Sequence, residues 1–205
     1  MKRFKLDNFV DRTCFILATV FGLGYLPERL GFKAGKGAGT LASIATVMLI
    51  QLPMLVHGAS AVFASIVALM SFIIGMGIVG RADRYILKTV GSQPDHTGAV
   101  VSGDFNQNCW DGVVGQSVAG LPVFFLPKIF PTVTIGEQFF ALFFLLVFFR
   151  FFDAVKPFGI KRIESLTKNE TFNILFDDVV AAIYTIITVS CIPFLFYAYY
   201  HILTA

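Results

Sequence analysis

The chain has 205 residues, of which 56% are hydrophobic and only 14% are charged, and its mean hydropathy is +0.76. Soluble domains carry about 25% charged residues, so this composition excludes a soluble globular protein and predicts an integral membrane protein. The net charge of +3 is small and its basic residues are dispersed, which excludes a nucleic-acid-binding protein. The length suits one membrane domain spanning residues 1–205.

The first 39 residues are expected to lie at the membrane surface. Residues 1–12 are charged and amphipathic, and the apolar run 13–26 is shorter than the roughly 20 residues that a crossing helix needs. That run predicts an interfacial or re-entrant helix, and residues 27–39 predict a glycine-rich loop.

Five later apolar segments predict membrane crossings. Short turns join the first to the second and the third to the fourth, whereas the other connections are long and polar. The predicted fold is therefore an all-α, polytopic membrane helical bundle of two helical hairpins plus a C-terminal crossing, with the N-terminal helix at its surface. The predicted crossings are residues 40–56, 59–80, 112–126, 138–152 and 179–203.

This topology places the predicted loops 27–39, 81–111 and 156–178 on the same side as the N-terminus. That side holds every lysine and arginine except Lys128, so the positive-inside rule makes it cytoplasmic. Every acidic residue except Glu137 lies there too. Carboxylates gathered at the ends of apolar helices predict a functional face on this side.

Three charged residues end the fourth predicted crossing. Arg150, Asp153 and Lys156 are spaced three apart, so they lie on roughly one face of a helix that Pro157 ends. One interpretation is an ion-pair ladder worth a few tenths of a kcal/mol. The other is a phosphate site beside the headgroup layer, with arginine as a fork and lysine as a point charge. The residues alone leave both open.

Two adjacent carboxylates, Asp177 and Asp178, precede the last predicted crossing. Acidic side chains at a helix N-terminus stabilise the helix dipole, which is one interpretation. The other is a Mg²⁺ site, because Mg²⁺ takes one or two carboxylates together with water and substrate phosphate. Asp111 and Asp153 are also expected at helix ends on the same side, which favours the metal site.

Residues 37–43 open the first predicted crossing with two glycines followed by a hydroxyl. Exposed N–H groups at such a helix start bind anions, so Gly39 and Thr40 are candidate phosphate-binding residues. Helix capping by Thr40 and close helix packing at the small residues explain the pattern equally well.

Together these stretches resemble the bacterial phosphatidylglycerophosphatase A family. Residues 149–157 and 177–182 are similar to its FR-x-x-D-x-x-KP and D-D-x-x-A-G segments, residues 39–43 to PGT-x-GS, and residues 110–115 to D-E-x-x-G. The resemblance covers most of residues 21–190. It implies a Mg²⁺-dependent lipid phosphatase that hydrolyses the terminal phosphomonoester of phosphatidylglycerophosphate and leaves phosphatidylglycerol.

The resemblance also implies residue roles. Four carboxylates would serve catalysis and bind the metal, and a second set would hold the substrate phosphate. It further implies a multi-pass protein of the bacterial inner membrane whose active face is cytoplasmic and whose partner is a phospholipid. The carboxylates are Asp111, Asp153, Asp177 and Asp178, and the phosphate-binding residues are Arg150, Lys156, Gly39 and Thr40.

One departure from the family pattern keeps a second function open. Gly112 stands where the family has glutamate, so one carboxylate is missing, and Asp104 is the candidate replacement. The alternative is a catalytically impaired relative that acts as a lipid-binding or partner subunit in the membrane. A CDP-alcohol phosphotransferase is excluded because no Ala-Arg follows Asp111 and Gly112. The sequence does not indicate an oligomeric state.

Overall fold

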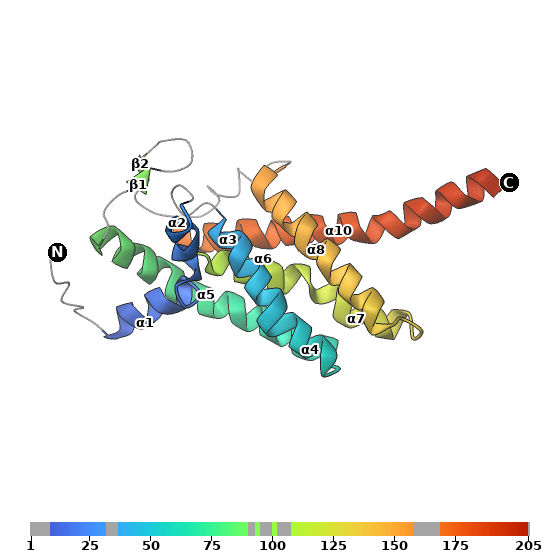
Figure 1. The fold of residues 1–205 in the computed structure, drawn as a ribbon, viewed down its shortest axis with the longest axis horizontal. Coiled ribbons are helices and arrows are strands. Elements are labelled where there is room, and N and C mark those ends of the chain that lie inside the picture. The colour runs from blue at the N-terminus through green and yellow to red at the C-terminus, as the bar shows by residue number, and fades with distance from the viewer. Residues whose placement is uncertain are drawn as a thin grey trace.

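The chain folds into a bundle of helices in a computed structural model (Figure 1). The strands in its described part have two residues each, and β1 (Gln93–Pro94) pairs antiparallel with β2 (Val100–Val101). The predicted all-α fold class is confirmed. The residues that the structure describes are 9–31, 37–89, 93–94, 100–101, 108–157 and 169–204.

Within the described residues, five helical segments are long and apolar enough to cross a membrane, which is the number that the sequence predicted. The first contains a π-helical turn, and the third is divided at Gly120. In chain order the segments are α3 (Ala38–Thr46), the π-helix η3 (Val47–Gln51) and α4 (Leu52–Val56); α5 (Ala61–Thr89); α6 (Trp110–Ala119) and α7 (Leu121–Ile129); α8 (Ile135–Val155); and α10 (Glu170–Thr204).

Two predicted loops are shorter than expected. Helix α5 continues to Thr89, so the first nine residues of the predicted 81–111 loop are helical. Helix α10 begins at Glu170, so the predicted loop 156–178 loses its last nine residues to that helix. Asp177 and Asp178 therefore lie two turns inside α10, and their interpretation as dipole-stabilising residues at a helix start is wrong.

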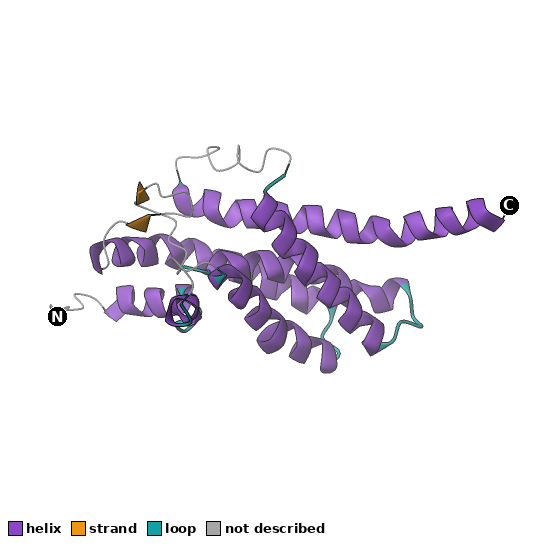
Figure 2. Cartoon of the chain, turned by 45° about the horizontal axis from the view of Figure 1, so that its top comes forward, coloured by secondary structure: helices purple, strands orange, loops and turns teal. Residues whose placement is uncertain are grey.

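The helix in the N-terminal run is too short to cross a bilayer. Helix α1 (Phe9–Ala18) has 10 residues, which rise only about 15 Å. The backbone then turns through positive φ angles at Val20 and Phe21, and the short helices η1 (Leu23–Tyr25) and α2 (Leu26–Arg29) follow. Helix α1 packs on the C-terminal part of α5, as Figure 2 shows for their neighbouring ribbons.

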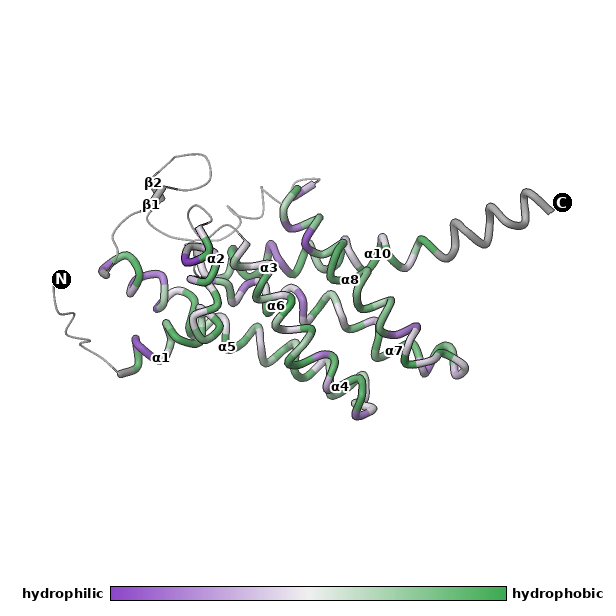
Figure 3. The backbone as a smooth tube through the Cα atoms, in the orientation of Figure 1, coloured by the Kyte–Doolittle hydropathy of each residue, from purple (hydrophilic) through white to green (hydrophobic). Residues whose placement is uncertain are grey.

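The crossing helices alternate in direction, so α3, α6 and α10 begin at the end of the bundle where α5 and α8 finish (Figure 1). We call this the site end. Apolar residues dominate the crossing helices in Figure 3, and many face outward, including Leu49, Phe140 and Phe143. Side chains facing lipid are expected to be apolar, because no water is present there to solvate polar groups.

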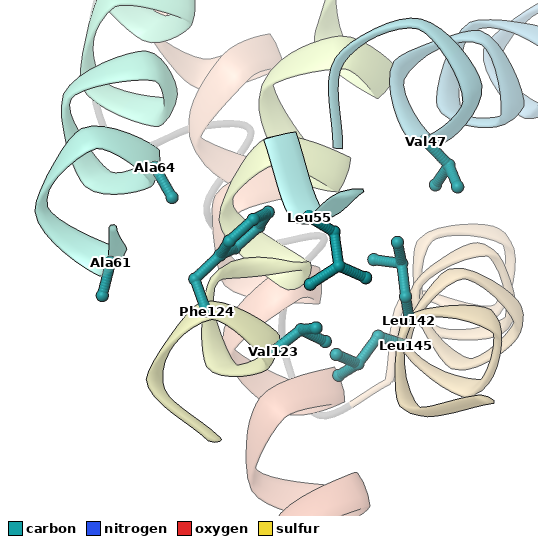
Figure 4. Close-up of a cluster of buried hydrophobic side chains, with 8 residues drawn as sticks. All are labelled: Val47, Leu55, Ala61, Ala64, Val123, Phe124, Leu142 and Leu145. Carbon is teal, nitrogen blue, oxygen red and sulfur yellow. The ribbon is translucent and has the colours of Figure 1, made fainter. Parts of the chain in front are cut away.

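Helix α6 occupies the centre of the bundle in both Figure 1 and Figure 2. Most of its residues are buried, and small ones such as Gly112, Gly115 and Ala119 recur along it. Small residues let helix backbones approach closely, which is how membrane helices associate without a hydrophobic driving force. Beyond α6, a core of apolar side chains fills the end of the bundle opposite the site end (Figure 4).

A pair of buried glutamines joins the first and third segments. Gln51 Nε2 donates to the Gln116 carbonyl at 2.9 Å, and Gln116 Nε2 donates to Gln51 Oε1 at 3.1 Å. Gly120 makes room for this pair, since a Cβ there would lie 2.1 Å from Gln51 Nε2. These bonds give both side-chain N–H groups an acceptor where lipid offers none, while Gln116 Oε1 has no hydrogen-bond partner in the described part of the chain.

We therefore predict that Gln51→Leu and Gln116→Leu each lower the free energy of unfolding in detergent by about 1 kcal/mol. Because the two side chains act as a pair, the double variant should lose less than the sum of the single losses. A double-mutant cycle of unfolding free energies measures this coupling, and strictly additive losses would contradict it.

Candidate functional site

The site end brings together predicted charged site residues from three helices. Asp111 lies in the first turn of α6, and Arg150 and Asp153 lie in the last two turns of α8. Asp177 and Asp178 face this region from α10. The clustering expected from the topology is therefore present, although these residues lie far apart in the chain.

The start of α3 and the start of α6 touch backbone to backbone. A Cβ added to Gly112 would lie 2.8 Å from the Gly39 carbonyl oxygen and 3.3 Å from Ser43 Oγ. Real Cβ atoms essentially never approach other atoms so closely, so this packing requires glycine at residue 112. A glutamate here, as in the family pattern, has no space.

Ser43 links this helix contact to the charged residues. Its hydroxyl lies 3.1 Å from the Gly39 carbonyl oxygen and 3.2 Å from the Gly112 carbonyl oxygen, so it donates to one of them at a time. The same oxygen accepts a hydrogen bond from Arg150 Nη1 at 3.3 Å. A buried serine thus holds the guanidinium against the start of α3.

The guanidinium of Arg150 is fixed on several sides. Nη2 forms an ion pair with Asp153 Oδ2 at 2.7 Å. A Cβ on Gly39 would lie 2.8 Å from that same Nη2, so glycine at residue 39 leaves the space that the guanidinium fills. This contact is the role that the structure gives to Gly39.

Lys156 ends α8 in a conformation that is unusual for its residue type. Its φ angle is 45°, in the left-handed region, and its N–H donates to the Phe152 carbonyl at 2.8 Å. Such a backbone costs about 1–3 kcal/mol for a non-glycine residue. The chain turns here before Pro157, and Lys156 Nζ pairs with Asp177 Oδ2 of α10.

Asp178 is the most enclosed of the four carboxylates. It is only 3% exposed, and its Oδ2 is buried without a hydrogen-bond partner in the described part of the chain. The carboxylates of Asp153, Asp111 and Asp177 lie within electrostatic range and repel it, whereas Arg150 attracts it. Burying a charge among like charges is expensive unless a cation compensates for it.

This arrangement fits Mg²⁺ by the chemistry of its donors. Within the described ranges, no group of three or more His, Cys, Asp or Glu side chains could hold a metal ion. Mg²⁺ does not require such a group, because it retains several waters and takes only one or two carboxylates. The partnerless Oδ2 of Asp178 is an oxygen ligand of the required kind.

No activated nucleophile is present among the described residues beside these carboxylates. The Ser43 hydroxyl is directed at backbone carbonyls, not at a base. Burial, together with the negative charge of Asp111, raises the pKa of the Cys109 thiol far above its usual value. A thiol that stays protonated is not nucleophilic, so the functional groups described at this site are carboxylates and cations.

The structure differs from the sequence prediction at some of the candidate site residues. Thr40 is exposed and does not cap α3, because the cap position is Gly37 with a φ angle of 92°. Asp104, the candidate replacement for the missing glutamate, lies outside the described residues. Sequence reasoning missed Ser43 as a site residue, although Ser43 belongs to the 39–43 motif. The tendency of serine side chains to hydrogen-bond to nearby backbone groups could have indicated its role.

Trp110 occupies the junction between the site and α5. Its indole Nε1 donates to the Ser71 carbonyl at 2.9 Å, and its ring fills the space above Gly75. The indole therefore ties α6 to α5 beside Asp111.

The comparisons with known proteins extend over this whole arrangement. A family model described as phosphatidylglycerophosphatase A matches residues 16–193. The matched range contains α3 to α8 and all of the carboxylates and cations discussed above. Neither the curated proteins nor the solved structures gave a significant match.

The close contact at Gly112 leads to a prediction about stability. Gly112→Ala should lower the free energy of unfolding by about 1–3 kcal/mol, because the new methyl group overlaps the Gly39 carbonyl. Gly77→Ala on α5 is the matched control, since a Cβ there meets nothing within 4 Å. Thermal unfolding of both variants in detergent makes the comparison, and equal midpoints would contradict the close packing.

Proposed function

The chain belongs to the phosphatidylglycerophosphatase A family, a family of phosphoric monoester hydrolases, and on that premise we propose its specific reaction. It hydrolyses the terminal phosphomonoester of phosphatidylglycerophosphate at the site end, with Mg²⁺ as cofactor, and leaves phosphatidylglycerol. The observation that carries this proposal is the buried Oδ2 of Asp178, which has no hydrogen-bond partner in the described part of the chain and lies near Arg150 and three further aspartates.

Arg150 and Lys156 are placed to receive the phosphate. In both ion pairs the side chain of the cation is more exposed than that of the carboxylate. Arg150 is 21% exposed and Asp153 17%, and Lys156 is 26% exposed and Asp177 7%. The cations therefore lie on the outer side of the cluster, where a lipid headgroup arrives. Arginine binds phosphate through its planar fork, and Ser43 and Asp153 already fix the orientation of that fork.

The carboxylates would hold the cofactor. Asp178 and Asp153 are the first candidates, and Asp111 and Asp177, whose charges also act on Asp178, would contribute through water. When bound, Mg²⁺ supplies charge neutralisation for the phosphate oxygens and makes a coordinated water more acidic.

The remaining chemistry belongs to the residues of the chain. A water attacks phosphorus, the bond from phosphorus to the glycerol oxygen breaks, and the water proton passes by way of a carboxylate to the departing oxygen. Arg150 and Lys156 stabilise the negative charge that develops on the phosphoryl oxygens. Direct attack by water is preferred because the described part of the site offers no activated serine or cysteine.

The proposed location of this reaction is the cytoplasmic face of the bacterial inner membrane. The support comes from the sequence, in which every lysine and arginine except Lys128 falls in segments that the predicted topology places on one side of the membrane. The acyl chains of the substrate remain in the bilayer while its phosphate reaches the cluster.

The second candidate function is a non-catalytic, lipid-binding or partner subunit. The observation that favours it is Gly112, where the close contact with α3 leaves no space for the glutamate of the family pattern. Turnover distinguishes the two functions, because a subunit without catalysis has no activity for a substitution to remove.

We predict that the purified chain releases phosphate from phosphatidylglycerophosphate in detergent with Mg²⁺ and loses this activity in EDTA. Asp178→Asn should lower kcat at least about 100-fold, because it removes a charge from the reacting centre. Glu137→Gln is the matched control, since glutamine preserves the capping box with Thr134 at the opposite end of the bundle. Activity that persists in EDTA would contradict the proposed dependence on Mg²⁺. The absence of activity with Mg²⁺ would favour the second candidate function, a non-catalytic subunit.

A stability measurement tests the metal separately from turnover. In EDTA, Asp178→Asn should raise the free energy of unfolding by about 1 kcal/mol or more, because it removes an uncompensated buried charge. Mg²⁺ should stabilise the wild type and Glu137→Gln, by about 2.7 kcal/mol at a concentration 100 times its Kd, but not Asp178→Asn. Equal Mg²⁺ shifts in all three proteins would contradict binding at Asp178.

A further inference from the structure

An apolar groove runs along the outside of the bundle between the first and fourth crossing segments, with a volume of about 310 Å³. Its floor includes Val47 and Leu142, which are buried and point toward one another in Figure 4. Its rims include Met48 and Phe143, which are each 58% exposed. The groove therefore has a closed floor and opens toward lipid.

The groove begins at the site. At the end of the groove nearer the site end, Ile44 lines one side and directly follows Ser43 in the chain. Leu146 lines the other side and lies one helical turn before Arg150. Ser43 and Arg150 are joined by a hydrogen bond across the same two helices. A molecule whose phosphate lies at Arg150 can therefore continue into the groove without leaving the protein surface.

The length of the groove matches one leaflet. Its lining runs from Ile44 to Leu52 on one side, and eight helical residues rise about 12 Å. The hydrocarbon core of a bilayer is about 30 Å thick, so one leaflet contributes about 15 Å. The groove thus reaches from the level of the site through most of the adjacent leaflet.

We propose that this groove binds an acyl chain of the lipid substrate and so positions its phosphate at Arg150, an inference that rests on the proposed function. A chain that moves from bilayer to groove leaves one hydrocarbon environment for another, so it gains little from the hydrophobic effect. The contribution is orientation: a held chain restricts where the headgroup lies and favours the reactive geometry.

Obstruction of the groove tests this proposal. Met48→Trp places an indole over the groove, whereas Leu49→Trp puts the same side chain one residue further, at a 73% exposed position that does not line it. With dipalmitoyl phosphatidylglycerophosphate, kcat/KM should fall about tenfold in Met48→Trp and less than about twofold in Leu49→Trp. With the deacylated, water-soluble substrate, both variants should equal the wild type. Equal losses in both variants, or with both substrates, would overturn the proposal.

A binding measurement separates the groove from catalysis. A non-hydrolysable phosphonate analogue with a diazirine on its acyl chain should label peptides from residues 44–52 and 139–146 of the wild type. Met48→Trp should reduce that labelling and Leu49→Trp should not. Labelling in the groove without any turnover would refute the proposed function alone. Labelling spread over all lipid-facing helices would refute only the proposal that the groove binds the acyl chain. A change of oligomeric state in Met48→Trp but not in Leu49→Trp, measured by light scattering, would refute it as well.

Discussion

The contact between Gly39 and Gly112 is the constraint on which the site depends. It brings the start of α3 so close to α6 that the Ser43 hydroxyl reaches both backbones and still accepts from Arg150. Arg150 in turn fixes Asp153 through their ion pair. Two residues without side chains thus determine where the charged groups of α8 lie, because a methyl group at either position would separate the helices or displace the guanidinium.

Four of the charged residues at the site end form two ion pairs, and the buried Asp178 belongs to neither pair. Arg150 pairs with Asp153 and Lys156 pairs with Asp177, whereas the buried Oδ2 of Asp178 has no partner in the described part of the chain. A protein normally avoids such a group, and those that persist are characteristic of functional sites. One buried carboxylate oxygen is thus left without a partner among the described residues, within the range that the family model matches.

The sequence predicted the bundle well because long apolar runs and the distribution of lysine and arginine determine crossings and topology. It predicted the gathering of Asp111, Asp153 and Asp178 for the same reason, since alternating helices bring their ends together. It did not predict that α5 and α10 extend beyond their apolar runs, because hydropathy indicates which residues lie in the membrane and not where a helix begins or ends. Gly112 shows the other limit: in sequence it is a missing carboxylate, and only packing shows it to be a close helix contact.

The placement of Trp110 has a practical consequence. It is the only tryptophan among the 205 residues, and its indole nitrogen is tied to the Ser71 carbonyl directly beside Asp111. Its intrinsic fluorescence therefore arises from a single point next to the carboxylates, with no background from other indoles. The emission of an unlabelled sample will therefore follow changes in polarity beside the carboxylates, without an attached dye.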